Sequence, residues 1–346
     1  MNKLEATAYS ALQLVRHRYD PEKDSSYGQF SSIYMAPTGN VVDTMAPFKN
    51  AAHVLTVGGA GAFGLEAKIN KAKKVDIFDC NELQRLFFEL VRTSIKIFTY
   101  NEFMEYFTLK VQSPFTTYAE AKNLLSPQMF YKIKNLLPYD AAFLFDLLYS
   151  NINHADMLFS GLFRFEHAMY REYLKRFASM YDEEKYYELQ KMLRSEASVI
   201  DYKQVSLIDV PDKFTGPYDL IVLGNIPQYY ESIPGLDTPY AFDMFIKKRL
   251  SKLLAPDGTI IVNYCFGLAT TAIKEFMGIP YTPNRFTSNY VNKLFLKEHM
   301  KKDINLGLLK RGGYEYFFID GVEMMEGQPL ENACLIYKPN NSLKRK

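Results

Sequence analysis

Hydrophobic residues in the central part of the chain gather into short runs separated by amphipathic stretches. The runs HVLTV, which starts at His53, and KKVDIFD, which starts at Lys73, are rich in β-branched and other apolar residues, as buried strands are. A stretch with helical character lies between them. This alternation predicts parallel strands joined by crossover helices.

Five later runs complete the predicted sheet. They are YKQVSLID (Tyr202 to Asp209), YDLIVLGN (Tyr218 to Asn225), GTIIVNYCF (Gly258 to Phe266), GYEYFFID (Gly313 to Asp320) and NACLIYKP (Asn332 to Pro339). A helical segment, AFDMFIKKRLSKLL, separates the second and third of these runs, as a crossover should. The last two runs are joined by a loop too short for a crossover helix, so we expect them to pair antiparallel. The sequence therefore predicts an α/β fold whose doubly wound, mostly parallel sheet ends in an antiparallel hairpin, the arrangement typical of S-adenosylmethionine-dependent methyltransferases.

The second and third predicted strands are separated by far more chain than one crossover helix needs. Helical patterns recur there, at Glu82 to Phe98, Tyr100 to Phe107, Pro127 to Leu136, Asp140 to Tyr149 and Glu166 to Leu193. Ahead of the sheet, a helix is expected at Leu4 to Arg18, followed by a polar, turn-rich arm. We therefore divide the chain into an N-terminal helix and arm (1–50), a Rossmann-like S-adenosylmethionine-binding domain (51–80 and 204–340) and an inserted helical subdomain (81–203).

Composition narrows the possible partners and the compartment. With 41 Lys and Arg against 39 Asp and Glu, the net charge of +2 gives no field that would gather nucleic acid or anionic lipid. No run reaches the roughly 18 apolar residues of a membrane span, and the first residues do not resemble a signal peptide. The three cysteines, Cys80, Cys265 and Cys334, form no C-x-x-C pair and predict buried thiols in a reducing cytoplasm. Nothing in the sequence indicates an oligomeric state.

The stretch VLTVGGAGAFGLEA places glycines between a predicted strand and a predicted helix. Gly58, Gly59 and Gly61, with Gly64 behind them, would let the chain turn tightly and let a ligand approach the main-chain N–H groups. The loop does not match G-x-G-x-x-G in register, so a purely structural turn is the alternative.

An acidic residue ends the second predicted strand at the spacing used for ribose recognition. Asp79 lies about 20 residues beyond the glycine loop, where a carboxylate can accept both ribose hydroxyl protons. Asp79 and Asn81 are also candidates for the N-cap of the following helix. Asp209, at the end of the third predicted strand, is a candidate contact for the adenine amino group, with a plain strand-end turn as its alternative.

The segment LGNIPQYY follows the fourth predicted strand, and open α/β sheets bind their ligands at the carboxyl ends of strands. Asn225, Tyr229 and Tyr230 are therefore candidates for orienting the reacting group, with Asn225 also near the cofactor. The segment loosely resembles the Asn-Pro-Pro-Tyr loop of several N-methyltransferases. The alternative is an ordinary connection from the strand to a loop, in which Pro227 marks the end of the strand.

Other kinds of active site find little support in the sequence. His154, Asp156, Glu166 and His167 form the one cluster that hints at a metal, but the spacing of a metal site is missing, so no metal is expected. The sequence contains no G-x-S-x-G nucleophile elbow and no G-x-x-x-x-G-K-[ST] phosphate-binding loop. Serine hydrolases and P-loop nucleotidases are therefore disfavoured.

Taken in order, several segments resemble a known family. These segments are TGNVVDTMAPFKNAAHVLTVGGAGAFGLEA, AKKVDIFDCNELQRLFFELVRTSIKIFTYNEFMEYF, FSGLFRFE and YDLIVLGNIPQYY. The set resembles the betaine-lipid synthase A type of S-adenosylmethionine:diacylglycerol 3-amino-3-carboxypropyltransferase and its uncharacterised bacterial relatives. The resemblance spans residues 38–265 and matches the family's Asp-x-Asn with Asp79, Cys80 and Asn81. The family's acidic residue in the glycine loop is not matched, because this chain has Gly59-Ala60-Gly61-Ala62-Phe63 there.

The resemblance implies an S-adenosylmethionine cofactor and displacement at the γ-carbon of its methionine moiety, with release of methylthioadenosine. The acceptor would be a small molecule or a lipid, and the apolar, aromatic insertion with the N-terminal arm would form its site. Methyl transfer to a small molecule is the alternative reaction. A non-catalytic nucleoside-binding or scaffold protein is the alternative from another class, motivated by the missing acid.

Overall fold

The computed structural model describes the chain in two compact units. Its described residues are 2–16, 32–37, 41–110, 117–164, 171–195, 199–224, 226, 233–236, 239–266, 309–311, 314–319 and 332–339. The first unit comprises Met1–Thr38, Gly58–Ile69 and Asp79–Gln204, and the second comprises Gly39–Val57, Asn70–Phe78 and Val205–Lys346. Among the described residues, no helix has the length and apolarity that crossing a bilayer requires.

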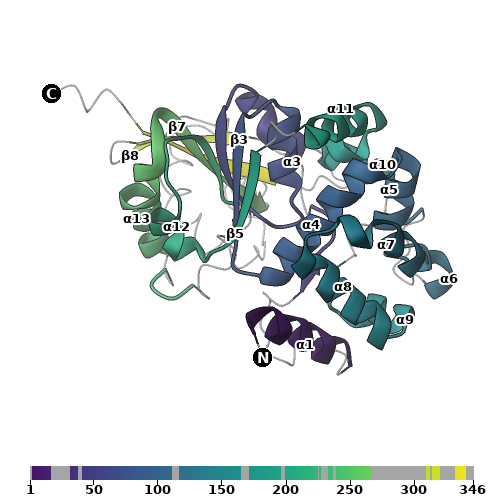
Figure 1. Ribbon diagram of the computed structural model, residues 1–346. Helices are drawn as coiled ribbons and strands as arrows, with labels where there is room; N and C mark the ends of the chain where they lie inside the picture. Colours follow the sequence, from purple (N-terminus) through teal and green to yellow (C-terminus); the bar gives the residue numbers. More distant parts are fainter. Residues whose placement is uncertain are drawn as a thin grey trace, which may run out of the picture. The chain divides into compact units, whose positions relative to one another are not determined.

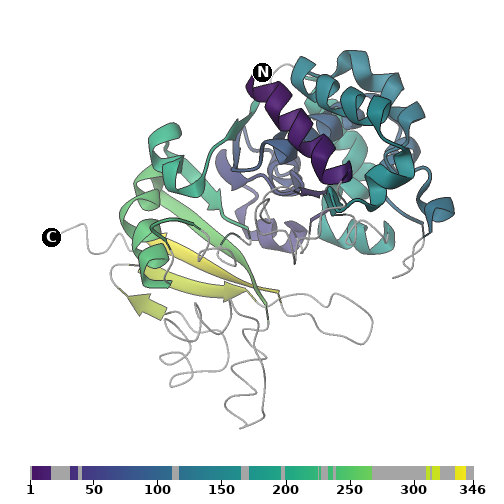
Figure 2. The same ribbon diagram turned by 90° about the horizontal axis from the view of Figure 1, so that it is seen from below.

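The second unit is built around a sheet whose strands follow one another in the order β3-β2-β6-β7-β10-β9-β8 (Figures 1 and 2). The strands are β2 (His53–Val57), β3 (Lys74–Asp79), β6 (Tyr218–Val222), β7 (Leu254–Phe266), β8 (Leu309–Arg311), β9 (Tyr314–Ile319) and β10 (Asn332–Pro339). Strands β3, β2, β6 and β7 are parallel, whereas β10 is antiparallel to both β7 and β9. The predicted α/β class and closing hairpin are confirmed. Strand β8, antiparallel to β9, has no counterpart in the prediction.

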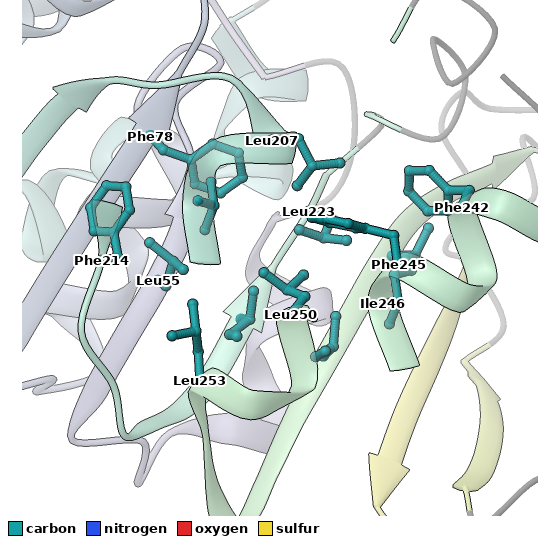
Figure 3. Packing of buried hydrophobic residues seen from close by; sticks show 14 of the residues in the cluster. Leu55, Phe78, Leu207, Phe214, Leu223, Phe242, Phe245, Ile246, Leu250 and Leu253 are labelled. Atoms are coloured by element: carbon teal, nitrogen blue, oxygen red, sulfur yellow. The ribbon is translucent and has the colours of Figure 1, made fainter. Parts of the chain in front are cut away.

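The parallel strands β2, β3 and β6 are buried along most of their length, and most of their central side chains are apolar. Leu55, Ile221 and Ile260 come from neighbouring strands and are fully buried in one cluster, part of which is drawn in Figure 3. The crossover from β6 to β7 contributes Phe242 and Leu250 through α13 (Pro239–Lys248) and the 3₁₀ turn η6 (Leu250–Leu253). A predicted single helix is thus divided into a helix and a turn, with its apolar side chains still in the core.

The predicted strand from Tyr202 to Asp209 is only partly correct. Strand β5 runs from Val199 to Gln204 and belongs to the first unit, and the chain then forms η4 (Leu207–Asp209) and α12 (Val210–Lys213). The proline of VPDK occupies the first turn of α12, where its missing N–H costs nothing. The apolar residues of this segment therefore reach the core from helical turns.

The first unit is mainly helical. Its helices are α1 (Lys3–Arg16), α3 (Ala62–Ile69), α4 (Glu82–Ile97), α5 (Tyr100–Phe107), α6 (Tyr118–Ala121), α7 (Pro127–Ile133), α8 (Tyr139–Asn151), α9 (His154–Phe159), α10 (Arg171–Phe177) and α11 (Glu183–Arg194). The unit also holds β5 and a two-residue parallel pair, β1 (Ile33–Tyr34) with β4 (Phe163–Arg164). In sequence, α4 to α11 lie between β3 and β5, and the division into an inserted subdomain (81–203) stays a prediction. Helix α1 packs against α8, α4 and α9 (Figures 1 and 2).

The single helix predicted from Glu166 to Leu193 is wrong over its middle part. Helix α10 ends at Phe177, the 3₁₀ turn η3 (Ser179–Tyr181) follows, and Asp182 then caps α11 by accepting a hydrogen bond from the Lys185 N–H. A short polar side chain at this N-cap satisfies an otherwise unpaired amide and lets a new helix start in a new direction. Residues 165–170 lie outside the described part.

Helix α3, which follows the glycine loop, is buried along its whole length. Its Glu66 carboxylate accepts hydrogen bonds from the N–H and the hydroxyl of Ser179, at 3.1 and 2.9 Å, and so fixes η3 against α3. Helix α11 packs on α3 as well. Residues of the insertion therefore hold the helix that leaves the glycine loop.

A buried carboxylate, Asp76 of β3, organises polar groups in the second unit. Its side chain is 3% exposed, and its Oδ2 accepts from the Tyr218 hydroxyl at 2.6 Å, from Lys74 Nζ at 3.0 Å and lies 2.9 Å from His53 Nε2. Burial raises the pKa of Asp76, but the hydrogen bonds from Tyr218, His53 and Lys74 outweigh it, so the pKa is lowered overall. The cluster therefore stabilises the folded chain only while the carboxylate is ionised.

Tyr218→Phe tests this cluster. We expect the free energy of unfolding at neutral pH to fall by about 1–3 kcal/mol, because a buried carboxylate loses a donor that nothing replaces. A lowered pKa in the folded state means that the stabilisation is present above about pH 4 and is lost as pH falls below it. The free energy of unfolding of the variant should therefore fall less than that of the wild type as the pH is lowered, as measured by urea unfolding at several pH values. The half-exposed Tyr9 gives the control Tyr9→Phe, and equal stability of the two variants would contradict the assignment.

Candidate functional site

The glycine loop turns the chain from β2 into α3 within a few residues. The Gly61 N–H donates to the Gly58 carbonyl at 2.7 Å, and the Leu65 N–H donates to the Gly61 carbonyl at 3.1 Å as the helix begins. Gly59 and Gly61 have φ values of +44° and +77°, in the left-handed region that residues with a Cβ seldom adopt. The expectation that these glycines allow a tight turn is confirmed.

Asp79, the last residue of β3, ties the glycine loop to the start of α4. Its Oδ2 accepts the Gly59 N–H at 3.1 Å, and its Oδ1 accepts the Asn81 N–H at 2.9 Å. The main chain and the thiol of Cys80 also donate to this carboxylate, so a ligand hydroxyl would bind in competition with donors of the protein. The carboxylate thus lies beside the glycine loop and is bonded to its main chain, and the predicted contact of Asp79 with a ribose stays a prediction.

Burial raises the pKa of Asp79 to about 6, against the opposing effect of the hydrogen bonds from the Asn81 and Gly59 amides. The carboxyl is therefore partly protonated just below neutral pH. A ligand that donates hydrogen bonds to it favours the ionised form and must displace a proton at lower pH.

Two aromatic rings lie on the glycines, and the sequence analysis did not single out either residue. A Cβ on Gly61 would come within 2.3 Å of the Phe88 ring, and a Cβ on Gly58 would come within 1.9 Å of the Tyr202 hydroxyl. The two rings contact each other with centroids 5.3 Å apart. Apart from Gly59 itself and its two neighbours in the chain, no atom of the described structure lies within 4 Å of a Cβ placed on Gly59. Gly58 and Gly61 therefore make room for aromatic side chains of the first unit, and Gly59 is the glycine of the three that faces open space.

Asn81 is the N-cap of α4. Its Oδ1 accepts the Leu83 N–H at 3.0 Å, and its Nδ2 donates to the Ser32 carbonyl at 2.8 Å, so the amide also holds the segment that contains β1. Of the two candidates for the cap, Asn81 takes this role. Its amide is thus already bonded at both ends within the protein.

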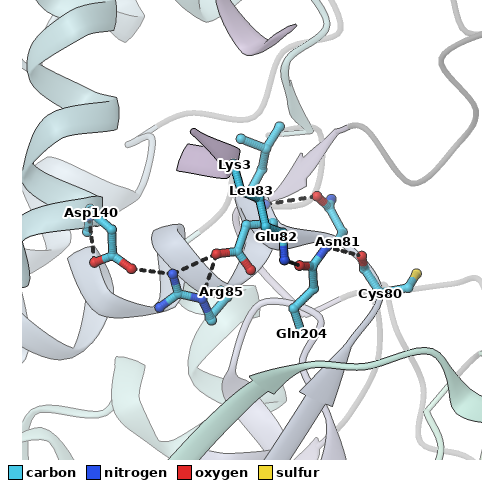
Figure 4. Close-up of polar contacts among 9 residues, drawn as sticks. Lys3, Cys80, Asn81, Glu82, Leu83, Arg85, Asp140 and Gln204 are labelled. Carbon is cyan, nitrogen blue, oxygen red and sulfur yellow. Dashed lines mark hydrogen bonds and ion pairs between the residues drawn. The ribbon is translucent and has the colours of Figure 1, made fainter. Parts of the chain in front are cut away.

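The main chain next to Asp79 is held from two further elements, drawn in Figure 4. Gln204 Nε2 at the end of β5 donates to the Cys80 carbonyl at 3.1 Å, and Lys3 of α1 donates to the Gln204 side-chain oxygen. Farther along α4, Arg85 bridges Glu82 and Asp140. The main chain next to the carboxylate is thereby held by β5 and α1, and α4 is held by α8.

The prediction of buried cysteines is wrong for Cys80, which is exposed. Partial desolvation of the sulfur and the adjacent Asp79 carboxylate nevertheless raise the pKa of its thiol to about 12. Cys80 is therefore a protonated thiol at neutral pH, unsuited to act as a nucleophile. The side chains of Cys265 and Cys334 lie outside those described.

The other predicted site residues do not join this group in the described structure. Asp209 does not end a strand, because it closes the turn η4, and it is exposed. Asn225, Tyr229 and Tyr230 lie outside the described residues, so their predicted role in orienting the reacting group stays a prediction.

The histidine that hinted at a metal is engaged within the helical unit. His154 Nε2 lies 2.9 Å from the Leu124 carbonyl oxygen and its Nδ1 lies 3.1 Å from the Tyr118 hydroxyl. Within the described ranges, no group of three or more His, Cys, Asp or Glu side chains is placed to hold a metal ion.

Comparison with known proteins finds distant structural similarity alone. No protein-family model and no curated protein matches this sequence. Among solved structures, it is similar to cofactor-bound Rv0187 from MTB, with 8% identity and a TM-score of 0.37 over 97% of this chain and 90% of that one. It is also similar to an O-methyltransferase from Bacillus cereus in complex with SAH, with 9% identity and a TM-score of 0.35 over 96% of this chain and 90% of that one. For N-methyltransferase NodS from Bradyrhizobium japonicum WM9 in complex with S-adenosyl-L-homocysteine, the identity is 11% and the TM-score is 0.32, over 96% of this chain and 98% of that one. Because these TM-scores are below 0.5, the fold assignment rests on the strand order.

Alanine substitutions distinguish the two left-handed glycines. Gly59→Ala should lower the free energy of unfolding by about 1–2 kcal/mol through the left-handed conformation alone. Gly61→Ala should cost about 1–3 kcal/mol more, because the Phe88 ring must also shift. Urea unfolding of both variants measures the difference.

A double-mutant cycle with Phe88→Leu provides the control for this comparison. The excess cost of Gly61→Ala should shrink when the ring is removed, whereas the cost of Gly59→Ala should not change. Equal costs for the two alanine variants would show that Phe88 does not lie on Gly61.

Proposed function

We propose that this protein is an S-adenosylmethionine-dependent transferase. The observation that carries the proposal is the Asp79 carboxylate, which is fixed on the Gly59 amide at the end of β3, beside the one glycine of the loop with open space above it. A partly buried carboxylate beside a glycine loop is the kind of acceptor that a ribose diol requires. The α/β sheet with its antiparallel end provides the matching fold.

The residues present fit the nucleoside part of this cofactor. Asp79 would accept hydrogen bonds from the ribose hydroxyls, and the absence of a Cβ at Gly59 would let the sugar approach the main chain. When bound, S-adenosylmethionine supplies a sulfonium leaving group whose adjacent carbons an acceptor nucleophile can attack. The protein then has to position the acceptor and exclude water.

Within this class we propose transfer of the 3-amino-3-carboxypropyl group, with release of methylthioadenosine. The segments that resemble the betaine-lipid synthase A type of transferase support this choice, whereas the missing acid in the glycine loop leaves methyl transfer as the alternative. Asn225, Tyr229 and Tyr230 remain the proposed residues for orienting the acceptor. Cys80 is not a candidate nucleophile because its thiol stays protonated.

The proposed acceptor is a small molecule or a lipid, held by the inserted helices and the N-terminal arm. The net charge of +2 gives no support to a nucleic-acid acceptor. Aromatic side chains are abundant in the insertion, but many of them, including Phe87, Phe103 and Tyr106, are fully buried as its own core.

A non-catalytic nucleoside-binding or scaffold protein is the second candidate. The packing of Phe88 on Gly61 and of Tyr202 on Gly58 favours it, because these glycines have a structural use that requires no cofactor. Turnover with any acceptor would exclude this candidate, whereas binding of a nucleoside without turnover would support it.

The pH dependence of nucleoside binding tests the role of Asp79. Methylthioadenosine should bind the ionised carboxyl, so its dissociation constant should rise about tenfold as the pH falls from 7 to 5. Isothermal titration calorimetry at several pH values measures this change, and the ligand's ribose and adenine keep their charge over the range.

Two variants complete the pH experiment. Asp79→Asn should bind much more weakly and lose the pH dependence, whereas Asp201→Asn, which changes a half-exposed aspartate of β5, should behave like the wild type. Circular dichroism establishes that both variants are folded. Binding that is equally tight in Asp79→Asn would contradict the proposed site, and absence of binding by the wild type would refute the proposed cofactor.

The nucleoside product decides between the two proposed reactions. Incubation with S-adenosylmethionine and a panel of lipid, amine and thiol acceptors should yield methylthioadenosine together with an aminocarboxypropylated acceptor. Chromatography with mass detection distinguishes this product from S-adenosylhomocysteine. S-adenosylhomocysteine with a methylated acceptor would contradict aminocarboxypropyl transfer and leave the methyltransferase alternative.

A further inference from the structure

The Tyr202 hydroxyl is buried over the glycine loop, and within the described part of the chain it has no hydrogen-bond partner. The ring cannot easily turn the hydroxyl towards water, because it is wedged between the Gly58 main chain and the Phe88 ring. A buried hydroxyl without a partner destabilises a folded protein, and such groups call for an explanation. The explanation that fits this location is a ligand.

The position of the hydroxyl identifies the kind of group that would bind it. The Tyr202 hydroxyl and Asp79 Oδ2 lie 1.9 and 2.9 Å from the same point, the place of a Cβ on Gly58, yet no hydrogen bond joins them. Burial, followed by the neighbouring Asp79 carboxylate, raises the pKa of Tyr202 well above its ordinary value, so the phenol keeps its proton. A protonated phenol beside a carboxylate offers one donor and one acceptor to the same ligand group.

We propose that Tyr202 is a specificity-determining residue that donates a hydrogen bond to a ribose hydroxyl of the ligand, while Asp79 accepts the proton of a ribose hydroxyl. A hydroxyl is both donor and acceptor, so it can bond both residues at once. The pair selects a nucleoside with an intact ribose diol over a deoxynucleoside. This inference rests on the proposed nucleoside site and adds a residue from β5 to it.

The proposal predicts an unusual combination of effects for Tyr202→Phe. The free protein should be as stable as the wild type or more stable, because the variant removes a hydroxyl that lacks a partner. Its dissociation constant for adenosine should rise about tenfold, because the bound ribose loses a donor. A merely structural tyrosine would instead lower stability and leave binding unchanged.

Tyr186→Phe is the matched control. Tyr186 is also buried in the first unit, but its hydroxyl donates to the Phe98 carbonyl at 2.9 Å. This variant should be less stable than the wild type in urea unfolding and should bind adenosine normally. Both variants remove a tyrosine hydroxyl, which lacks a described hydrogen-bond partner in Tyr202 and has one in Tyr186.

Deoxynucleosides test which ligand group is recognised. Calorimetric titration with adenosine, 2′-deoxyadenosine and 3′-deoxyadenosine should show that one deoxynucleoside binds the wild type and Tyr202→Phe equally, because it lacks the hydroxyl that Tyr202 contacts. Equal weakening of all three ligands, unchanged adenosine binding, or a loss of stability like that of Tyr186→Phe would overturn the proposal. If the wild type binds adenosine and Tyr202→Phe does too with the same affinity, this inference alone fails. If the wild type binds no nucleoside, the proposed function fails with it.

Discussion

The hydrogen bonds of one carboxylate hold the candidate site together. Asp79 accepts one amide from the glycine loop and one from the start of α4, so a single side chain fixes the end of β3, the loop before α3 and the cap region of α4. The same enclosure that makes these bonds strong also raises the pKa of the carboxyl to about 6. Desolvation of the Asp79 carboxyl therefore both strengthens the hydrogen bonds that order the site and makes the site sensitive to pH.

The glycines of the loop serve two purposes, which the structure separates. Gly58 and Gly61 give space to Tyr202 and Phe88, whereas Gly59 adopts a left-handed conformation beside open space. A glycine-rich turn between a strand and a helix is therefore not by itself a measure of how much main chain a ligand can reach. Here Gly59 alone of these three glycines has no described neighbour near its Cβ position, and the Asp79 carboxylate accepts its N–H.

Much of the fold was predictable because its parallel strands are buried on both faces. The runs around Leu55 and Ile221 are mostly apolar, and such runs are hard to mistake for surface helices. Helix α5 was predictable for another reason, since Thr99 and Glu102 form a capping box at its start. Strand β5 was misplaced because it is polar and partly exposed, while the apolar residues after it belong to short helical turns.

The site was predictable only as far as local sequence spacing reaches. When two adjacent parallel strands are joined by one crossover helix, the loop after the first strand lies beside the residue that ends the second. The number of residues between the glycine loop and Asp79 therefore predicts that the two lie together. The contacts of Phe88 and Tyr202 with the glycines join residues from distant parts of the sequence, and neither residue carries a local signal. Asn81 had two possible roles in the sequence, and the hydrogen bond from Leu83 identifies the cap.

The most direct test of the account is the number of protons released when methylthioadenosine binds. Calorimetric titration at pH 6 in two buffers of different ionisation enthalpy gives this number. A carboxyl with a pKa of about 6 that must be ionised to hold the ribose should release about half a proton per ligand, and Asp79→Asn should release none. Binding without proton release, or release that persists in Asp79→Asn, would show that Asp79 is not the group that holds the nucleoside.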